Sequence, residues 1–313
     1  SHYQSFAWHP EGPLDASVIQ KVLYSMTKVS ISLFVPCKNE EANLARCLQS
    51  VQWVDEIFIV DSQSTDRTCL IAEELGAKVV QFEYKGAWPK KKNWALENLT
   101  FSHDWVLILD ADECLPPEAE EEIRKIVSLP HEKRAGYWIN RRYFFLGKPL
   151  KYAYFPNWNL RLFKHKLGRY EKITDLNTDS GDNEIHEHVV VQGSTGKLTS
   201  IMDHHAFPTI DSFVEKHNRY SNWEAVVENS AQEDSSTLQH EAVKSKRILR
   251  KVFRRLPFRP TLRFLYVYLW QGGILDGWRG YIFARLHGQY EFLSAAKAKA
   301  SSLSRKEPGK TSI

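Results

Sequence analysis

Between residues 29 and 129, short apolar runs alternate with segments of helical periodicity, and this alternation restricts the possible folds more than any other feature. Strands are expected at residues 31–35, 56–60, 78–81 and 105–109. Helices are expected between them, at residues 43–51, at 64–75 with Ser64 or Thr65 as cap, and at 91–99. Such alternation predicts an α/β fold, in which helices cover both faces of a parallel sheet.

The remainder of the chain has a different pattern. Short β-prone runs at residues 137–140, 160–163, 189–192 and 198–202, separated by turn-rich stretches, predict an added β region. From Thr209, a candidate helix cap, the chain is mostly helical, and the polar end at residues 301–313 is predicted to be disordered.

The composition excludes several classes of protein. The net charge is only +4, and the four cysteines form no C-x-x-C pair, so a disulfide framework or a zinc knuckle is not expected and the thiols are taken as reduced and cytosolic. No run approaches the ~18 apolar residues of a spanning helix, and no signal peptide is recognisable. Residues 1–25, ahead of Met26, are interpreted as an extension, a processed leader or a cloning remnant.

Two carboxylates, Asp110 and Asp112, follow the apolar run at 105–109. Ligands of open α/β sheets bind beyond the carboxyl ends of the strands, and Mg²⁺ is often shared between one or two carboxylates and substrate phosphates. The triplet therefore indicates a metal that holds a phosphorylated substrate. Alternatively, Asp112 and Glu113 cap the next helix, whose Pro117 and acidic first turn suit a helix start.

Polar side chains also follow the first and second expected strands, in segments 36–41 and 61–66. As helix caps and turn formers, Asn39, Ser64 and Asp66 each have a structural explanation. That explanation does not account for carboxylates or amides after nearly every strand of one sheet. We therefore expect these segments to converge on one crevice.

Three of these segments resemble the motifs of family 2 glycosyltransferases of the GT-A fold: VPCKNEE at 35–41, VDSQSTD at 60–66 and LDADE at 109–113. Lys92 and Asn93 fit the same pattern, and the resemblance covers about residues 29–130. The segments at 185–187, 203–205 and 272–277 are similar, more loosely, to the branch that includes lipopolysaccharide core glucosyltransferases.

The resemblance implies roles for individual residues. The nucleotide-sugar contacts would come from Pro36, Asn39, Glu40, Asp61, Lys92, Asn93, Asp110 and Ala111. Within this set Asp61 would accept a hydrogen bond from the base, classically uracil. Ser62 stands where many relatives have a second Asp, so base and ribose contacts are expected to differ.

The resemblance also implies a divalent metal, Mg²⁺ or Mn²⁺. Asp110 and Asp112 would form its motif, with Asp112 the more direct ligand, and the ion would stabilise the departing nucleoside diphosphate. We add His204, from the Asp203-His204-His205 segment, as a candidate for the metal shell or the diphosphate; a purely structural histidine is the alternative.

Inverting sugar transfer needs a general base that takes a proton from the acceptor hydroxyl. Our candidate is Glu187, which lies between two histidines and, with Asp112, completes the predicted catalytic residues. Asp182 and Glu184 are competing candidates, and a solvated polar loop is the structural alternative.

Aromatic and cationic residues suggest the acceptor site. A sugar-stacking platform is predicted from Tyr143, Phe144, Phe145, Tyr152, Tyr154, Phe155 and Trp158, with core packing expected for about half of them. Arg141, Arg142 and Arg161 are predicted to hold an anionic acceptor.

A basic amphipathic segment follows. Nine Lys and Arg residues and no acid lie between positions 244 and 263, beside an apolar stripe. This pattern predicts contact with an anionic membrane surface through residues 244–270, with a solvated face packed on the catalytic domain or a nucleic-acid site as alternatives.

The predicted protein is an inverting, metal-dependent glycosyltransferase that moves a sugar from a UDP-linked nucleotide sugar to a saccharide or lipid-linked saccharide. Its expected place is the cytoplasm, on the inner face of the membrane, in lipopolysaccharide or cell-surface glycan synthesis. The predicted architecture is a Rossmann-like GT-A sheet in a catalytic domain at 29–207, divided into a nucleotide-sugar half (29–130) and an acceptor half (131–207). An extension (1–28) precedes it, and a helical region (208–300) and the tail (301–313) follow.

Three alternatives remain open. A polyprenyl-phosphate sugar synthase is the nearest, although the hydrophobic segments for its acceptor are weak. A sugar-phosphate nucleotidyltransferase would need a Gly-rich loop, and residues 36–41 contain no glycine. A non-catalytic membrane- or nucleic-acid-binding protein is disfavoured by the intact carboxylates.

Overall fold

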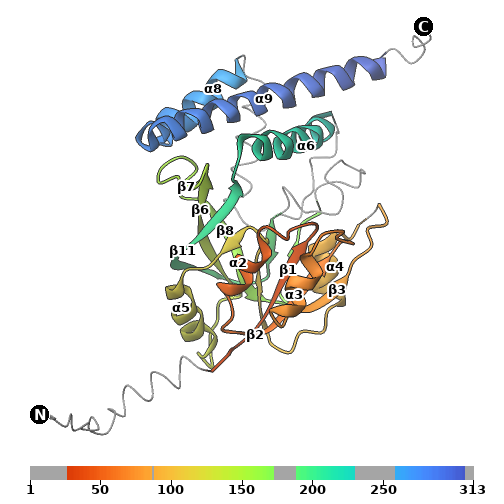
Figure 1. Ribbon diagram of the computed structural model, residues 1–313, viewed down its shortest axis with the longest axis vertical. Coiled ribbons are helices and arrows are strands. Elements are labelled where there is room, and N and C mark those ends of the chain that lie inside the picture. Colours follow the sequence, from red (N-terminus) through yellow and green to blue (C-terminus); the bar gives the residue numbers. More distant parts are fainter. Residues whose placement is uncertain (1–26, 87, 173–187, 230–257, 307–313) are drawn as a thin grey trace, which may run out of the picture.

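Four parallel strands form the first half of the sheet in a computed structural model that describes residues 27–86, 88–172, 188–229 and 258–306 (Figure 1). Their order is β3-β2-β1-β4. The strands are β1 (Val29–Cys37), β2 (Val54–Asp61), β3 (Lys78–Gln81) and β4 (Trp105–Ile108). The intervening helices are α2 (Leu44–Gln49), α3 (Thr68–Glu74) and α4 (Lys91–Asn98). The predicted alternation is confirmed.

The predicted β region extends the same sheet instead of forming a separate unit. Beyond β4 the order is β8-β6-β11-β5, with β7 paired to β6. These strands are β5 (Glu113–Cys114), β6 (Gly136–Phe145), β7 (Lys148–Pro149), β8 (Trp158–Lys164) and β11 (Thr195–Phe207). A separate hairpin joins β9 (Gly168–Tyr170) to β10 (Val189–Val191). The antiparallel β5–β11 pair sets His204 opposite Glu113, directly after the predicted metal motif.

The sheet buries an apolar cluster on each face. Leu33 and Val35 of β1 pack with α2, α3 and α5 (Pro117–Val127), whereas Phe34 packs with α4 on the opposite face. Neighbouring residues of a strand point to opposite faces, so a strand covered on both sides must be apolar throughout. This explains the continuous apolar runs and confirms helices on both faces.

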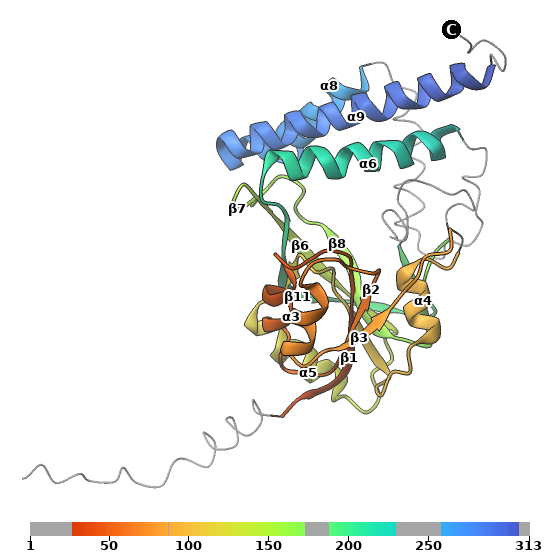
Figure 2. The ribbon, with the colours of Figure 1, turned by 45° about the vertical axis from the view of Figure 1, so that its right-hand side comes forward.

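A helical layer lies at one end of the sheet. It contains α6 (Ile210–Asn229), α8 (Arg259–Leu265), η1 (Tyr266–Trp270), η2 (Gly273–Asp276) and α9 (Gly277–Lys306). Both views show α6 between the sheet and the adjacent helices α8 and α9, which are outermost (Figures 1 and 2). Within the described ranges no helix has both the length and the hydropathy to cross a bilayer.

The structure corrects three local predictions. Helix α5 starts after Pro116 without a side-chain cap, so neither Asp112 nor Glu113 caps it. Helix α3 starts at Thr68, whose N–H and hydroxyl donate to Asp66, so Ser64 and Thr65 do not cap it. Helix α9 continues to Lys306, six residues into the predicted disordered tail. Thr209 is confirmed as a cap, since its hydroxyl accepts the Ser212 N–H at 3.1 Å.

Two buried histidines lie in the aromatic cluster that joins α6, α9 and the sheet. His217 of α6 stacks on Phe213, with ring centroids 3.7 Å apart, and its Nδ1 donates to the Phe213 carbonyl at 2.8 Å. His287 of α9 stacks on Tyr154. Burial lowers the pKa of His217 to about 4 and holds the pKa of His287 well below its usual value, so both rings are neutral near pH 7.

We expect acid to weaken this helical layer. A histidine in the unfolded chain has a pKa of ~6.5. As the pH falls from there to ~4, His217 therefore binds a proton in the unfolded state but not in the folded state. The free energy of unfolding should therefore decrease as the pH decreases through that window, and His217 should contribute up to ~1.4 kcal/mol of this decrease per pH unit. Urea unfolding across the window should show a smaller loss for His217→Phe than for the exposed control His131→Phe. Equal losses in the two variants would contradict this account.

Candidate active site

The loops after β1 and β2 are joined by hydrogen bonds. Asn39 has a left-handed backbone (φ 55°); its side-chain oxygen accepts the Thr65 N–H at 2.8 Å, and its own N–H donates to Ser64 at 2.8 Å. The Glu41 N–H donates to Asp66 at 3.1 Å. Asn39 and Ser64 thus cap no helix but, with Asp66, hold the two loops side by side at the strand ends, and only Asp66 also accepts the N–H of the first residue of α3.

Asp61 ends β2 and is fully buried. Its Oδ2 accepts the Ser64 N–H at 2.9 Å and the Gln81 side-chain amide at 3.0 Å. Burial alone would raise the pKa of Asp61, but the hydrogen bonds from Ser64 and Gln81 outweigh it and keep the pKa below its usual value. The carboxylate is therefore ionised, and it is an acceptor fixed in place.

Asp110 is held between two cations. Its Oδ1 lies 2.8 Å from Lys92 Nζ of α4, and its Oδ2 lies 2.6 Å from a guanidinium nitrogen of Arg161 of β8. These charges outweigh burial and keep the pKa of Asp110 well below its usual value. Lys92 thus reaches the predicted crevice, whereas Asn93 holds β9, exchanging hydrogen bonds of 2.8 and 2.9 Å with the backbone of Tyr170.

Glu113 extends this network; the sequence placed it in the LDADE motif and, alternatively, in a helix cap, but assigned it no part in an ion-pair network. It is fully buried; Arg161 and Arg141 both donate to its Oε1, Arg141 at 3.0 Å, and the Asp110 N–H donates to its Oε2 at 2.9 Å. Arg141 and Arg161, predicted to hold an anionic acceptor, are therefore engaged with internal carboxylates. Arg142, the third arginine, pairs with Asp203 at 2.7 Å.

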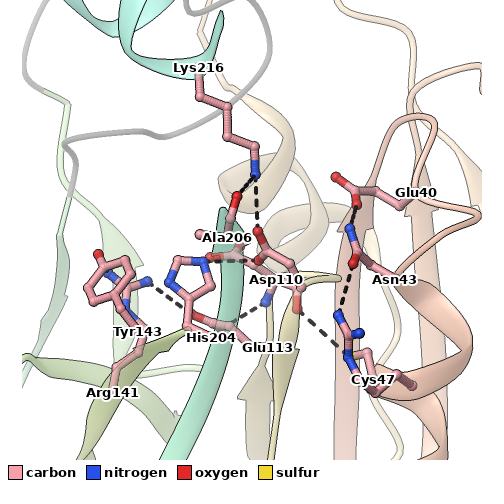
Figure 3. A network of polar contacts seen from close by, with 12 residues as sticks. Glu40, Asn43, Cys47, Asp110, Glu113, Arg141, Tyr143, His204, Ala206 and Lys216 are labelled. Atoms are coloured by element: carbon pink, nitrogen blue, oxygen red, sulfur yellow. Dashed lines mark hydrogen bonds and ion pairs between the residues drawn. The ribbon is translucent and has the colours of Figure 1, made fainter. Parts of the chain in front are cut away.

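Asp112 contacts residues from two distant parts of the chain. Its Oδ1 lies 3.1 Å from His204 Nε2 of β11, and its Oδ2 lies 3.2 Å from Lys216 Nζ of α6. Figure 3 shows Lys216 reaching from α6 toward the strand ends, where His204 and Glu113 lie. Although burial opposes ionisation, His204 and Lys216 lower the pKa of Asp112 far below its usual value. The sequence carried no signal for Lys216, which lies 104 residues away.

The donor set at Asp112 fits a divalent ion that is shared with a substrate. Asp112 and His204 offer a carboxylate and an imidazole within 3.1 Å of each other, and His204 Nδ1 is buried without a hydrogen-bond partner in the described structure. In the same ranges no group of three His, Cys, Asp or Glu residues forms a complete metal cage. An ion here would need further oxygens from phosphate and water, which is how Mg²⁺ is commonly bound.

Glu40, Pro36 and Ala111 lie around these carboxylates. Burial, together with the nearby Asp112 charge, raises the pKa of Glu40, although Asn43 donates to it at 2.9 Å. Pro36 is half-buried in β1, opposite Val60 of β2. Ala111 is buried in the sheet core, so its side chain faces away from solvent.

A pocket opens beside Asp110. Two tryptophans, Trp138 and Trp158, form part of its wall together with Arg161 and His188. Trp158 belongs to the predicted aromatic platform, whereas Trp138 was missed because its apolar run indicated only a strand. The predicted core role applies to Tyr143, Phe145 and Tyr154, which pack in the aromatic cluster below α9. Glu187, Asp182 and Glu184 lie outside the described residues.

Comparisons with known proteins identify the family. The family model described as Glycosyl transferase family 2 matches residues 32–182. The lipopolysaccharide core biosynthesis glycosyltransferase LpsC of Rhizobium meliloti is 31% identical over 280 residues, which cover 86% of this chain and 92% of LpsC. An uncharacterised glycosyltransferase of Rickettsia conorii is 36% identical over 200 residues, covering 62% of this chain and 69% of that protein.

Two solved structures show weaker likeness. Glucosyl-3-phosphoglycerate synthase of Mycobacterium tuberculosis, in complex with Mn²⁺, UDP and glucosyl-3-phosphoglycerate, is 18% identical with a TM-score of 0.35, covering 69% of this chain and 85% of that one. Residues 1–349 of S. aureus TarS are 16% identical with a TM-score of 0.40, covering 89% and 91%. The identity with LpsC over nearly its whole length is decisive: the chain belongs to glycosyltransferase family 2 and is a glycosyltransferase.

Proposed function

We propose that this enzyme transfers a sugar from a UDP-linked nucleotide sugar, with inversion, to a saccharide or lipid-linked saccharide of lipopolysaccharide or another cell-surface glycan. One observation carries the proposal: Asp112, His204 and Lys216 converge at the carboxyl end of β4, although they come from three separate parts of the chain. The similarity to LpsC over 92% of its length supports the class of product.

The donor would lie across the ends of β1, β2 and β4. Pro36, Asn39 and Glu40 would border this crevice on one side, and ionised Asp61, at the end of β2, is our candidate acceptor for a base N–H. Lys216, positioned by Asp112, brings a positive charge that suits a diphosphate. The crevice thus offers an acceptor for the base and a cation for the phosphates.

Asp112 and His204 would hold Mg²⁺ or Mn²⁺, and the bound ion would supply Lewis-acid stabilisation of the departing diphosphate. Asp110 contributes differently in this proposal. Both oxygens of Asp110 are already paired, with Lys92 and Arg161. Asp110 would therefore orient Lys92 instead of serving as the main ligand of the metal ion.

The acceptor would enter the pocket beside Asp110, where Trp138 and Trp158 offer aromatic surface to the C–H groups of a sugar. Arg141 and Arg161 are paired with internal carboxylates. We therefore favour stacking of the acceptor sugar on the tryptophans, and not ion pairs with these arginines, as the main acceptor contact. Glu187 remains our candidate base. Its neighbour in the sequence, His188, lines this pocket.

Association with the inner face of the cytoplasmic membrane completes the proposal. Of the predicted membrane segment at 244–270, residues 244–257 lie outside the described structure.

Replacing Asp112 should separate chemistry from folding. Asp112→Asn removes the charge that attracts a cation, and we expect transfer from UDP-sugars with Mn²⁺ to fall by ~10²-fold or more. The matched control is Asp203→Asn, which alters a neighbouring carboxylate paired with Arg142 and should change transfer only a few-fold (~2–3). Near-normal turnover of a folded Asp112→Asn protein would exclude the proposed role.

Glu113 should behave in the opposite way, as a structural charge. Glu113→Gln leaves Arg141 and Arg161 buried with a single carboxylate, and removing one partner of a buried pair costs ~3–5 kcal/mol. Glu121→Gln, in an exposed pair with Lys125, should cost no more than ~0.5 kcal/mol. Urea unfolding measures both, and similar values for the two variants would show that the network is not needed for folding.

Glu187→Gln tests the base. We expect kcat to collapse while UDP with Mn²⁺ still raises the melting temperature, because proton removal is lost and donor binding is kept. If the variant turns over at a near-normal rate, the role passes to Asp182 or Glu184, which the same substitution to the amide examines in turn.

A further inference from the structure

Exposed apolar side chains gather on one part of the described surface. Sixteen large hydrophobic residues of the described chain are exposed, and eleven of them lie between positions 258 and 303. Trp270 is 84% exposed, Leu275 66%, and Leu269 and Trp278 56% each. Soluble proteins seldom leave such side chains together in water unless another surface covers them.

Most of these residues belong to the outermost helices of the molecule (Figures 1 and 2). Along α9, Trp278, Tyr281, Arg285 and Phe292 follow each other at helical spacing and are all exposed. A groove runs between α8 and α9, lined by Pro260, Phe264, Tyr281, Arg285 and Phe292. Gly288 allows this close approach, because a Cβ there would lie 2.9 Å from the Pro260 carbonyl oxygen. We name the exposed side of α8, η1, η2 and α9 the outer helical face.

We propose that the outer helical face docks on an anionic lipid bilayer. Its chemistry matches the membrane interface, where Trp and Tyr rings sit at the headgroup level and Arg side chains reach toward phosphate. Arg279 lies 4.4 Å from the Trp278 ring centroid and Arg285 lies 5.6 Å from that of Phe264, so cations border the apolar surface.

The charge of this layer favours a lipid surface over a second copy of the chain. Residues 258–306 contain eight Arg and Lys but only two acids. Both acids are already engaged: Asp276 accepts the backbone N–H groups of residues 151–153, and Glu291 pairs with Arg259 at 2.7 Å. Two such faces would repel each other, whereas anionic headgroups attract them.

Docking in this way also orients the active site. Helix α6 lies between the outer helices and the sheet (Figure 2), and its Lys216 pairs with the predicted metal residue Asp112. The strand ends that carry the site therefore face the same side as the outer helical face. A saccharide projecting from the bilayer would approach the enzyme on that side, which gives the proposed lipid-linked acceptor a route to the site.

Vesicle flotation with the full chain tests the proposal. The protein should float with phosphatidylcholine vesicles that contain phosphatidylglycerol, and salt should weaken this binding. The double variant Leu269→Ser/Trp270→Ser should bind at least about tenfold more weakly, the change that ~1.4 kcal/mol of lost partitioning produces. The matched control is Leu70→Ser/Leu129→Ser, which removes two exposed leucines outside the layer and should bind as the unaltered protein does.

A second pair of variants tests the charge. Arg279→Gln/Arg285→Gln should weaken binding roughly fivefold for each lost cation, while Lys125→Gln/Lys133→Gln, which alters two exposed lysines outside the layer, should not. Flotation needs no turnover, so its result is independent of the proposed transferase chemistry, and transfer to a soluble acceptor should be unchanged in all four variants.

Three outcomes would overturn the proposal. One is the absence of flotation with anionic vesicles, and another is equal binding by the Leu269/Trp270 variant and its control. The third is a change from dimer to monomer in the Leu269/Trp270 variant, by sedimentation, without vesicle binding, which would assign the face to a second copy. If only substitutions within 244–256 abolish flotation, attachment lies there instead and the outer helical face is not the docking surface.

Discussion

Five charged side chains, of which Lys92, Glu113 and Arg161 are buried, determine the geometry of this enzyme's site. Asp110 and Glu113 bind Arg141, Arg161 and Lys92, which come from β6, β8 and α4. Each of the buried charges would be costly alone, and pairing with an opposite charge compensates that cost. The network joins the parallel half of the sheet to its mixed half. It therefore holds the end of β4, and with it Asp112, at a fixed point.

The same network gives different surroundings to two carboxylates that the sequence alone could not distinguish. Asp110 and Asp112 look equivalent as two carboxylates after a strand, yet Asp110 is held by two cations of the sheet and α4, whereas Asp112 faces His204 and the helical layer. This difference arises from contacts between strands that are distant in the sequence. Local pattern predicts neither the pairing of β5 with β11 nor the position of Lys216.

The parts of the fold that were predictable are those governed by local rules. Strands β1, β2 and β4 are covered on both faces and therefore contain continuous apolar runs, and Gly76 ends α3 with a positive φ of 78°. The two-residue strand Glu113–Cys114 has no such pattern, and its neighbour Asp112 was equally well explained as a helix cap. Similarly, aromatic residues in the segment 143–158 divide between the core and the pocket according to long-range packing, which their residue type does not reveal.

The central claim is that Asp112 and His204 together hold a divalent ion against the donor diphosphate. Pulsed electron paramagnetic resonance of the enzyme with Mn²⁺ and UDP tests this directly, because a coordinated imidazole nitrogen modulates the manganese signal. The account predicts this nitrogen modulation in the unaltered protein and its loss in His204→Gln. Nitrogen modulation that persists in His204→Gln, or a UDP complex whose Mn²⁺ shows none in the unaltered protein, would contradict it.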